Sequence, residues 1–230
     1  MRYTGQVLIC DADDTLWENN VVFERVIDDY LDWLAHPTLD RGELRAILDD
    51  VERANSEAHG YGIKVFLRSL HDCFARLRER PATERERQEI LELADALINH
   101  RVELIPGVAD TLDELKARHE LLLLTKGDPE EQQRKIDASG LAGHFQNVYI
   151  VREKHAGTYL RLVEQHGFPP GRAWMIGNSP KSDILPARRA GMNAVFIPNE
   201  NTWALEEDEL DPADDRVLQL ARFPDLLGHF

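Results

Sequence analysis

Three acidic side chains lie close together near the start of this sequence, directly after a short apolar run. The run spans residues 7–10, and Asp11, Asp13 and Asp14 follow it. Such a run is typical of a strand buried on both faces of a parallel sheet, and ligands bind beyond the carboxyl ends of such strands. Crowded carboxylates repel one another and lose hydration when buried, so they usually serve a cation or a chemical reaction. The alternative is a polar loop in which Asp14 or Thr15 caps a turn.

Polar side chains also follow three later apolar segments that are predicted strands. These strands are predicted at residues 121–124, 146–151 and 173–176. The polar side chains that follow them are Thr125 and Lys126, then Lys154, and then Asn178 and Asp183 in the segment 177–183. Because the carboxyl ends of parallel strands share one edge of a sheet, we expect all these clusters to converge. Carboxylates, a hydroxyl, an ammonium group and loop amides in one place suit phosphoryl transfer with a bound Mg²⁺.

The elements that must position these clusters alternate as in an α/β domain, apart from one long insertion. A further strand is predicted at 194–197, and helices are predicted between the later strands. Before residue 104, apolar residues instead recur at helical spacing in four segments separated by breaks that contain Pro or Gly. We therefore predict a Rossmann-like α/β core with a five-stranded parallel sheet, formed by residues 1–17 and 104–230, and an inserted four-helix bundle at 18–103.

Local signals mark several helix ends in this scheme. Thr83 and Glu86 match a capping box, and Asp128 matches an N-cap directly before a proline. In the tail, the acidic run 206–215 is expected to be a solvated surface, and a last helix is predicted at 217–220.

The composition narrows the classes of partner and compartment. The 230 residues carry 27 Lys and Arg against 42 Asp and Glu, a formal net charge of −15. Such a charge repels phosphate backbones, so no nucleic-acid partner is expected. The two cysteines, Cys10 and Cys73, indicate no disulfide framework. Neither a signal peptide nor an apolar run of transmembrane length is visible, so we expect a cytoplasmic protein with no membrane partner.

The polar clusters together resemble the motifs of the haloacid dehalogenase superfamily, in the type whose helical cap is inserted after the first motif. Residues 7–15 resemble the first motif, in which apolar residues precede Asp-x-Asp-x-Thr. Residues 121–125, Lys154 and residues 177–183 resemble the second, third and fourth motifs, in the same order. The resemblance covers nearly the whole chain. It implies a Mg²⁺-dependent phosphomonoester hydrolase that acts on a small phosphometabolite through an aspartyl phosphate.

The resemblance also implies a role for each matched residue. Asp11 would be the nucleophile, and Asp13 would be the acid that protonates the leaving alcohol and the base that then activates water. Thr125 and Lys154 would complete the catalytic set. The phosphoryl group would be bound by Ala12, Asp13, Thr125, Lys126 and Lys154. The metal ligands would be Asp11, Asp13, Asn178 and Asp183.

Asn178 departs from the family pattern, which has an aspartate at this position of the fourth motif. An amide oxygen can ligate Mg²⁺, but it contributes no negative charge. Either Asn178 ligates the metal directly with Asp183 behind it, or Asp183 carries more of that role.

Two other functions remain open from the sequence. A phosphomutase of the same superfamily shares the first half-reaction and returns the phosphoryl group to a sugar. A non-catalytic phosphometabolite-binding or protein-interaction module is the alternative of another class. Asp13 argues against a true dehalogenase, because dehalogenases of the superfamily lack an acid there. His59 and Tyr61, in a loop of the insertion, are candidate substrate contacts or a solvated turn; neither the substrate nor the oligomeric state is predicted.

Overall fold

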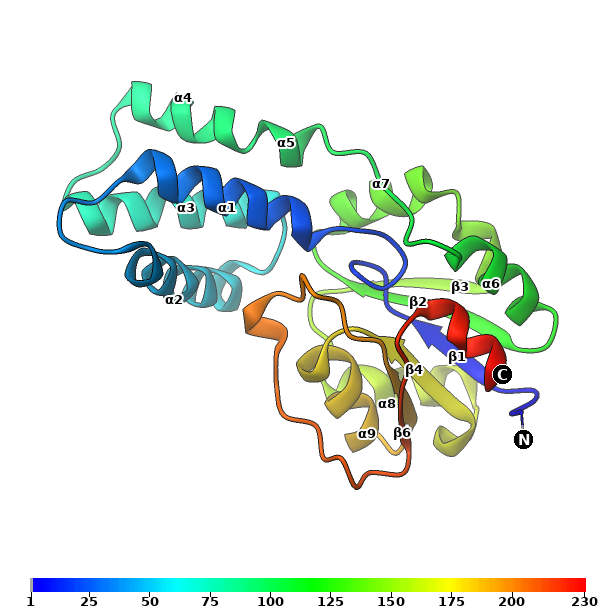
Figure 1. The fold of residues 1–230 in the computed structure, drawn as a ribbon. Helices are drawn as coiled ribbons and strands as arrows, with labels where there is room; N and C mark the ends of the chain where they lie inside the picture. Colours follow the sequence, from blue (N-terminus) through cyan, green and yellow to red (C-terminus); the bar gives the residue numbers. More distant parts are fainter. Residues whose placement is uncertain (1) are drawn as a thin grey trace. The chain divides into compact units, whose positions relative to one another are not determined.

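The computed structural model describes residues 2–230 and divides the chain into two compact units. An α/β unit comprises the chain up to Asn20 together with residues 102–230, and a helical unit comprises residues 21–101 (Figure 1). Each unit has its own hydrophobic core. Within residues 2–230, no helix combines the length and the apolar character needed to cross a membrane.

The α/β unit is built on a six-stranded sheet in the order β3-β2-β1-β4-β5-β6. The strands are β1 (Val7–Cys10), β2 (Glu120–Lys126), β3 (Asn147–Val151), β4 (Ala173–Gly177), β5 (Asn193–Phe196) and β6 (Val217–Gln219). All pairs are parallel, and in the centre Ile9 pairs with Leu122 on one side and Met175 on the other. This is the doubly wound order of Rossmann-like sheets, in which the strand order reverses next to β1. The predicted class is therefore confirmed.

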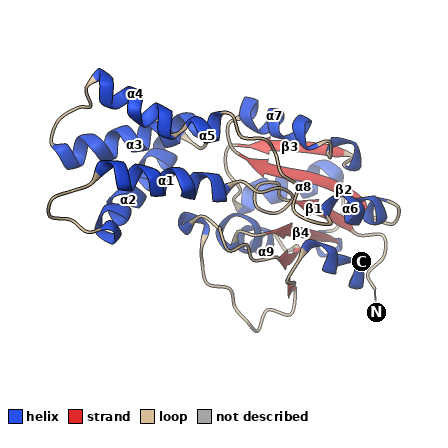
Figure 2. Cartoon of the chain, turned by 45° about the horizontal axis from the view of Figure 1, so that its top comes forward, coloured by secondary structure: helices blue, strands red, loops and turns tan. Residues whose placement is uncertain are grey.

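Both faces of the sheet are covered, which explains why its central strands are apolar throughout (Figure 2). On one face, the side chains of Leu8 and Cys10 pack with helix α6 (Val108–Lys116) and with the C-terminal 3₁₀ segment Phe223–Gly228. On the other, Val7 and Ile9 pack with α8 (Ala156–His166) and α9 (Leu185–Arg189). Helix α7 (Pro129–Ser139) lies on the first face through Ile136.

The sixth strand corrects two predictions, the five-stranded sheet and a final helix at 217–220. Val217–Gln219 instead forms the edge strand β6, paired with β5. An apolar segment of this length is compatible with either state, and only the exposed edge of β5 decides between them.

The helical unit contains four longer helices and one short helix. They are α1 (Asn20–Leu34), α2 (Arg41–His59), α3 (Ile63–Arg78), α4 (Glu84–Leu93) and α5 (Asp95–Ile98). Their apolar faces meet in one core, which includes Tyr30, Leu48, Leu70 and Phe74. The capping box of Thr83 and Glu86 is confirmed, whereas the fifth helix adds a short turn to the four that were predicted.

The chain leaves and re-enters the α/β unit along two adjacent segments. Trp17 pairs with Leu104 in an antiparallel bridge, and the Glu18 amide donates to the carbonyl oxygen of Glu103 at 2.9 Å. Both segments are therefore anchored to the α/β unit just before the helical unit begins and just after it ends.

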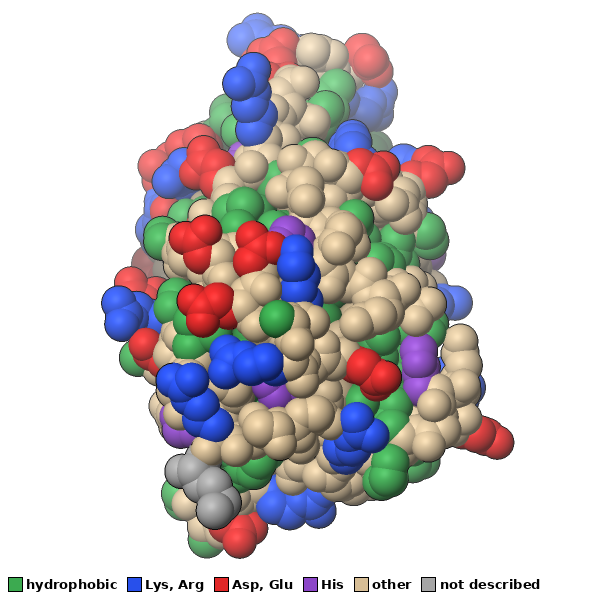
Figure 3. All heavy atoms as spheres, turned by 90° about the vertical axis from the view of Figure 1, so that its right-hand side faces the viewer, with side chains coloured by type: hydrophobic (Ala, Val, Ile, Leu, Met, Phe, Trp, Pro, Cys, Tyr) green, Lys and Arg blue, Asp and Glu red, His purple; other side chains and the backbone are tan. Residues whose placement is uncertain are grey.

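Charge is mixed on the face of the molecule drawn in Figure 3. Acidic and basic side chains are interspersed there. Although the formal net charge is −15, the acidic side chains do not form a single patch on that face.

Candidate active site

The loop after β1 directs its acidic side chains to different places. The Asp11 amide continues the ladder by donating to Ile176 O at 2.9 Å, and the amides of Thr15 and Leu16 then turn back to Ala12 O. Asp14 has a positive φ of 60° and accepts hydrogen bonds from the amides of Asn19 and Asn20 at the start of α1. Asp14 therefore serves the structure of the loop.

Asp11 is part of a buried ion triad at the carboxyl end of the central strands. Lys154 Nζ donates to Asp11 Oδ1 and, at 2.7 Å, to Asp183 Oδ1. All three side chains are buried. Burial raises the pKa of Asp11 above its usual range, and the charge of Asp183 adds to this effect while Lys154 opposes it. Burial disfavours the ammonium of Lys154, but the two carboxylates more than offset this and raise its pKa, so the lysine stays charged.

Asp183 reaches this triad by folding back over Gly177. Its other oxygen, Oδ2, accepts a hydrogen bond from the Ser179 amide at 3.0 Å. A Cβ atom on Gly177 would lie 2.2 Å from Asp183 Oδ2 and 2.8 Å from its Cβ. Glycine is therefore required at position 177 by close approach of this buried side chain.

Gly177→Ala is accordingly expected to destabilise the fold by about 1–3 kcal/mol, the range for overpacking a filled site. Displacement of Asp183 should also weaken the hold on Lys154. Urea unfolding measures the first effect. Gly143→Ala is the matched control, because a Cβ there meets nothing within 4 Å. Equal stabilities of the two variants would contradict the argument.

Thr15 connects Asp11 to Asn178 and so gathers oxygen atoms in one place. Its hydroxyl lies 3.2 Å from Asp11 Oδ2 and 3.1 Å from Asn178 Oδ1. The amide nitrogen of Asn178 donates to Thr202 Oγ1 at 3.2 Å. Among residues 2–230, no three His, Cys, Asp or Glu side chains are grouped so as to hold a metal by themselves. A cation at this point would therefore depend on one carboxylate, an amide oxygen and backbone carbonyls, which are the hard oxygen donors that suit Mg²⁺.

Asp13 lies apart from the triad and is only partly buried, with 23% of its side chain exposed. Trp17 Nε1 donates to its Oδ1 at 2.7 Å. Lys135 Nζ contacts both of its oxygens, at 2.9 and 3.0 Å, and Gln132 Nε2 contacts Oδ2 at 3.1 Å. Neither Gln132 nor Lys135 was among the residues predicted for the site. Nothing in the sequence of this amphipathic helix predicts that its polar residues contact a side chain more than a hundred positions away.

Thr125 is presented to the site by the end of β2. It is buried, and its Oγ1 accepts from Gln132 Nε2 at 2.6 Å, which leaves the hydroxyl hydrogen available to a further acceptor. A Cβ on Gly127 would come within 2.9 Å of Gln132 Cγ, so this glycine makes room for the glutamine. The structure thus joins Thr125 and Asp13 through one amide.

Lys126, which is half-buried, forms a further ion pair with the buried Glu206. Its ammonium contacts the Glu206 carboxylate and Ser182 Oγ, the latter at 2.8 Å. Glu206 also accepts from Ser179 Oγ at 2.6 Å. Burial alone would raise the pKa of Glu206, but Lys126 and the two serines lower it below its usual range. The expectation that the whole run 206–215 is solvated is therefore wrong at its first residue, because Glu206 is buried and paired with the ammonium of Lys126.

The loop between β5 and β6 is tied to the site at several points. Asn199 Nδ2 donates to Asp14 O at 3.1 Å, and Asn20 Nδ2 donates to Asn201 O at 2.6 Å. With the contact of Thr202 to Asn178, these bonds hold the loop against both the first and the fourth polar clusters.

The structure thus brings most of the predicted residues to one edge of the sheet. Asp11, Lys154 and Asp183 are in contact, Asn178 is joined to Asp11 through Thr15, and Asp13 and Thr125 are joined through Gln132. The two candidate substrate contacts belong to the helical unit. His59 is exposed at the end of α2, and Tyr61 is half-buried in the loop that follows.

Fold and site together define a doubly wound α/β protein with a buried carboxylate–lysine centre at the switch point of its sheet. Residues 6–191 match the family described as haloacid dehalogenase-like hydrolase. The chain belongs to this family, and it is a hydrolase.

The chain is similar to several individual members of known name. It is 27% identical over 229 residues to the phosphoserine phosphatase of Thermus thermophilus, covering 84% of this chain and 88% of that protein. It is 30% identical over 103 residues to human N-acylneuraminate-9-phosphatase, covering 43% and 42%. A crystal structure of a haloacid dehalogenase-like family hydrolase from Xanthomonas campestris superposes with a TM-score of 0.80 at 26% identity, covering 98% of this chain and 95% of that one.

Proposed function

We propose that this protein is a Mg²⁺-dependent phosphatase that hydrolyses a small phosphomonoester through an aspartyl phosphate on Asp11. The observation that carries the proposal is a second, partly exposed carboxylate, Asp13, two residues from the buried nucleophile and held by donors of its own. An alkoxide leaving group needs a proton, and we assign its supply to Asp13. The relatives described above are named as phosphatases, which agrees with this chemistry.

In the first step, Asp11 acts as the nucleophile. One of its oxygens forms a bond to phosphorus while the bond from phosphorus to the ester oxygen breaks, and that electron pair passes to the leaving oxygen. The proton of the Asp13 carboxyl moves to the same oxygen, so that an alcohol leaves and Asp13 remains as a carboxylate.

In the second step, Asp13 acts as a base. It takes a proton from water as the water oxygen bonds to phosphorus, and the bond between phosphorus and Asp11 breaks. Inorganic phosphate leaves, Asp11 regains its carboxylate, and Asp13 regains the proton that it gave in the first step.

Donors at the sheet edge would bind the phosphoryl oxygens. We assign this role to the Thr125 hydroxyl, the Lys154 ammonium and the amides of Ala12 and Asp13. Lys126 is a weaker candidate, because its ammonium already contacts Glu206 and Ser182.

The oxygen donors described above fit Mg²⁺. We propose as ligands the Asp11 carboxylate, the Asp13 carbonyl and Asn178 Oδ1, which Thr15 already gathers around Asp11. Asp183 would stand behind them, since both of its oxygens accept hydrogen bonds from Lys154 and Ser179. A bound Mg²⁺ would neutralise charge on the phosphoryl group.

The substrate is proposed to be a small phosphorylated metabolite, with the helical unit supplying specificity. His59 and Tyr61 are the residues proposed to contact it. We also propose a cytoplasmic location, which the two free, buried cysteines support.

The test is release of inorganic phosphate from a panel of sugar phosphates, nucleotides, phosphorylated acids and p-nitrophenyl phosphate, with and without Mg²⁺. We expect Mg²⁺-dependent release from at least one member of the panel. Transfer to a sugar, with no release in the absence of an acceptor, would instead identify a phosphomutase. Binding without turnover of any ester would overturn the proposal.

Asn178→Asp is expected to lower the Mg²⁺ concentration that gives half-maximal activity. The variant adds a negative charge beside the proposed metal position, where the native side chain offers only an amide oxygen. A Mg²⁺ titration of phosphate release measures this half-saturating concentration. It should fall about tenfold for each 1.4 kcal/mol of Mg²⁺ binding free energy that the variant gains. An unchanged or higher half-saturation would show that residue 178 does not ligate the metal.

A further inference from the structure

We propose that Lys135 is a positioning residue for Asp13, holding this carboxylate by a two-point ion pair and stabilising the charge that develops on it as its proton leaves. This inference rests on the proposed phosphatase function. It assigns a role in that reaction to helix α7, which carries none of the polar clusters that the sequence singled out.

Helix α7 is firmly placed at both ends and along one side. The side chain of Asp128 accepts hydrogen bonds from the amides of Glu130 and Glu131, as the predicted N-cap requires, and Gly140 ends the helix in the left-handed conformation. Ile136 is buried in the core of the α/β unit. The helix therefore cannot rotate about its axis without exposing Ile136, and this fixes the direction of its polar side chains.

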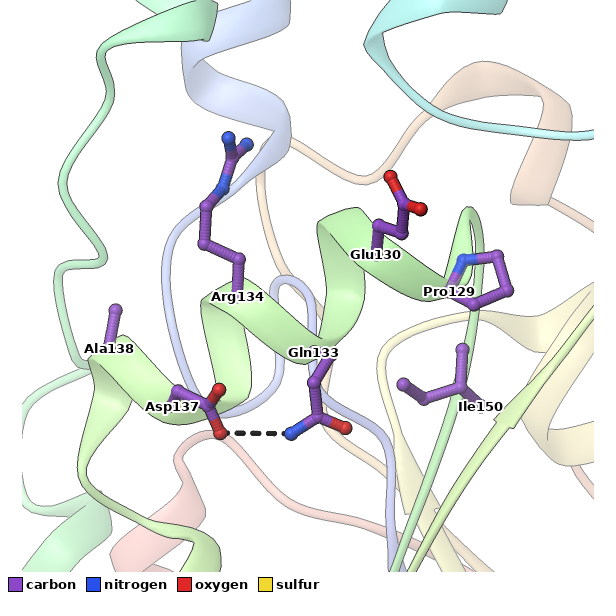
Figure 4. Close-up of a pocket in the computed structure, with 7 residues that line it drawn as sticks. All are labelled: Pro129, Glu130, Gln133, Arg134, Asp137, Ala138 and Ile150. Carbon is purple, nitrogen blue, oxygen red and sulfur yellow. Dashed lines mark hydrogen bonds between the residues drawn. The ribbon is translucent and has the colours of Figure 1, made fainter.

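The two faces of α7 differ in what they contact. Figure 4 shows Glu130, Gln133, Arg134 and Asp137 along a surface pocket, with Gln133 hydrogen-bonded to Asp137. Lys135 is not among the side chains that line this pocket; it contacts Asp13 in the loop after β1 instead. One face of the helix thus meets the surface and another the catalytic loop.

Lys135 is well suited to fix a carboxylate. Its side chain is 16% exposed, and Nζ lies 2.9 and 3.0 Å from the two oxygens of Asp13 and 2.8 Å from Asn19 Oδ1. A second carboxylate, that of Glu131, lies 3.9 Å from the ammonium. With Trp17 bonded to Oδ1 as well, the carboxylate is held from several directions. A side chain that is ordered before substrate binds loses less entropy when it transfers a proton.

The ion pair also acts on the transition state. As the Asp13 proton passes to the ester oxygen, negative charge grows on the Asp13 carboxylate, and a fixed ammonium nearby stabilises this charge. In the proposed reaction, Lys135 touches neither the substrate nor phosphorus. Its effect should therefore appear only for esters whose leaving group needs the proton.

The leaving group separates this role from a merely structural one. An alkyl phosphate leaves as a strongly basic alkoxide and needs the acid, whereas p-nitrophenolate leaves unprotonated. Because kcat/KM includes only the steps up to departure of the leaving group, it isolates the step in which Asp13 is the acid.

The experiment compares kcat/KM for an alkyl phosphate and for p-nitrophenyl phosphate in Lys135→Met. We expect a loss of about 10–100-fold for the alkyl ester, within the range of general acid catalysis, and a change below about threefold for the aryl ester. Lys116→Met is the matched control, because Lys116 is exposed and pairs with exposed Asp113 on α6. In an Asp13→Asn background, Lys135→Met should cause no further loss with the alkyl ester.

Each other outcome has a definite meaning. Equal losses for both esters, no loss for either, or a further loss in the Asp13→Asn background would overturn the role of Lys135 while leaving the phosphatase proposal intact. Absence of phosphate release from both esters by the unaltered protein would instead overturn the proposed function. Should Lys135→Met fail to fold, Lys135→Gln keeps a polar side chain and takes its place. The loss of kcat/KM for the alkyl ester is then compared with the loss for the aryl ester in the same way.

Discussion

Replacing Asp11 with asparagine is expected to abolish turnover and to raise the stability of the fold. An amide is not a nucleophile for phosphorus under these conditions, so kcat/KM should fall on the order of 10⁴-fold or more. Stability should rise because burial and Asp183 hold the pKa of Asp11 above its value in the unfolded chain. A carboxyl group with a raised folded pKa destabilises the fold once pH exceeds its unfolded pKa, near 4, and a neutral isostere removes that penalty at neutral pH.

Thermal unfolding at about pH 7.5 measures the second effect, at roughly 2–4 °C for each kcal/mol gained in a chain of this size. Asp29→Asn is the control, since Asp29 is an exposed carboxylate on α1. Mass spectrometry of acid-quenched enzyme should find a phosphoryl group on the peptide with Asp11 in the native protein alone. Retention of more than about a tenth of native kcat/KM in Asp11→Asn would exclude Asp11 as the nucleophile.

The sequence predicted which polar residues lie at the carboxyl edge of the sheet, because that prediction needs only the ends of the strands. A buried strand in a parallel sheet is a short apolar run, and the first polar residue after it must lie at the carboxyl edge. Asp11, Thr125 and Asn178 all follow such runs, and the structure places each of them at the end of β1, β2 or β4. Lys154 lies three residues after β3, so it too was predicted from the end of a strand, although it stands further from that end than the others.

What the sequence could not predict are contacts made across the fold by ordinary residues. Lys135 meets Asp13 from 122 positions away, and Glu206 meets Lys126 from 80. A lysine on a helix and a glutamate in an acidic run look solvated, because burial of a charge depends on a partner that only the folded chain supplies. The last strand, β6, was missed for a related reason, since a short edge strand is defined by its neighbour.

Asn178 shows how far the family pattern can be carried. The residue was expected to ligate the metal either directly or with Asp183 taking over. In the structure, Asn178 Oδ1 faces Thr15 and Asp11, while Asp183 is engaged with Lys154 and Ser179. We therefore propose the first alternative, in which Asn178 ligates the metal directly and Asp183 stands behind it.

Lys154→Met should cause the largest loss of stability among the changes considered for this site. The substitution removes the only cation between Asp11 and Asp183 within the triad and leaves two buried carboxylates facing each other. Removing one partner from a buried ion pair typically destabilises a fold by about 3–5 kcal/mol. Turnover should be lost as well, because Lys154 also neutralises the phosphoryl group in the proposed mechanism.

The loss of stability in Lys154→Met should grow with pH. Without the lysine, the pKa of Asp11 rises further above its unfolded value, so the folded variant binds a proton that the unfolded chain has released. Stability then falls as pH rises from the unfolded pKa toward the folded one. Urea unfolding at about pH 5.5 and about pH 8 should therefore show the larger deficit at the higher pH, with exposed Lys116→Met as the matched control.

A double variant separates the charge argument from loss of packing. Met replaces the aliphatic part of Lys154, so the remaining deficit should come from the two carboxylates. In an Asp11→Asn background, Asp183 is the one buried carboxylate left in the triad. Lys154→Met should then destabilise the fold less than it does in the native protein. The difference is the interaction energy of the two substitutions, and it should fall within the usual range of about 0.5–3 kcal/mol. Additive effects of the two substitutions would mean that Lys154 stabilises the fold by packing, and that the buried triad is not the electrostatic unit that its geometry indicates.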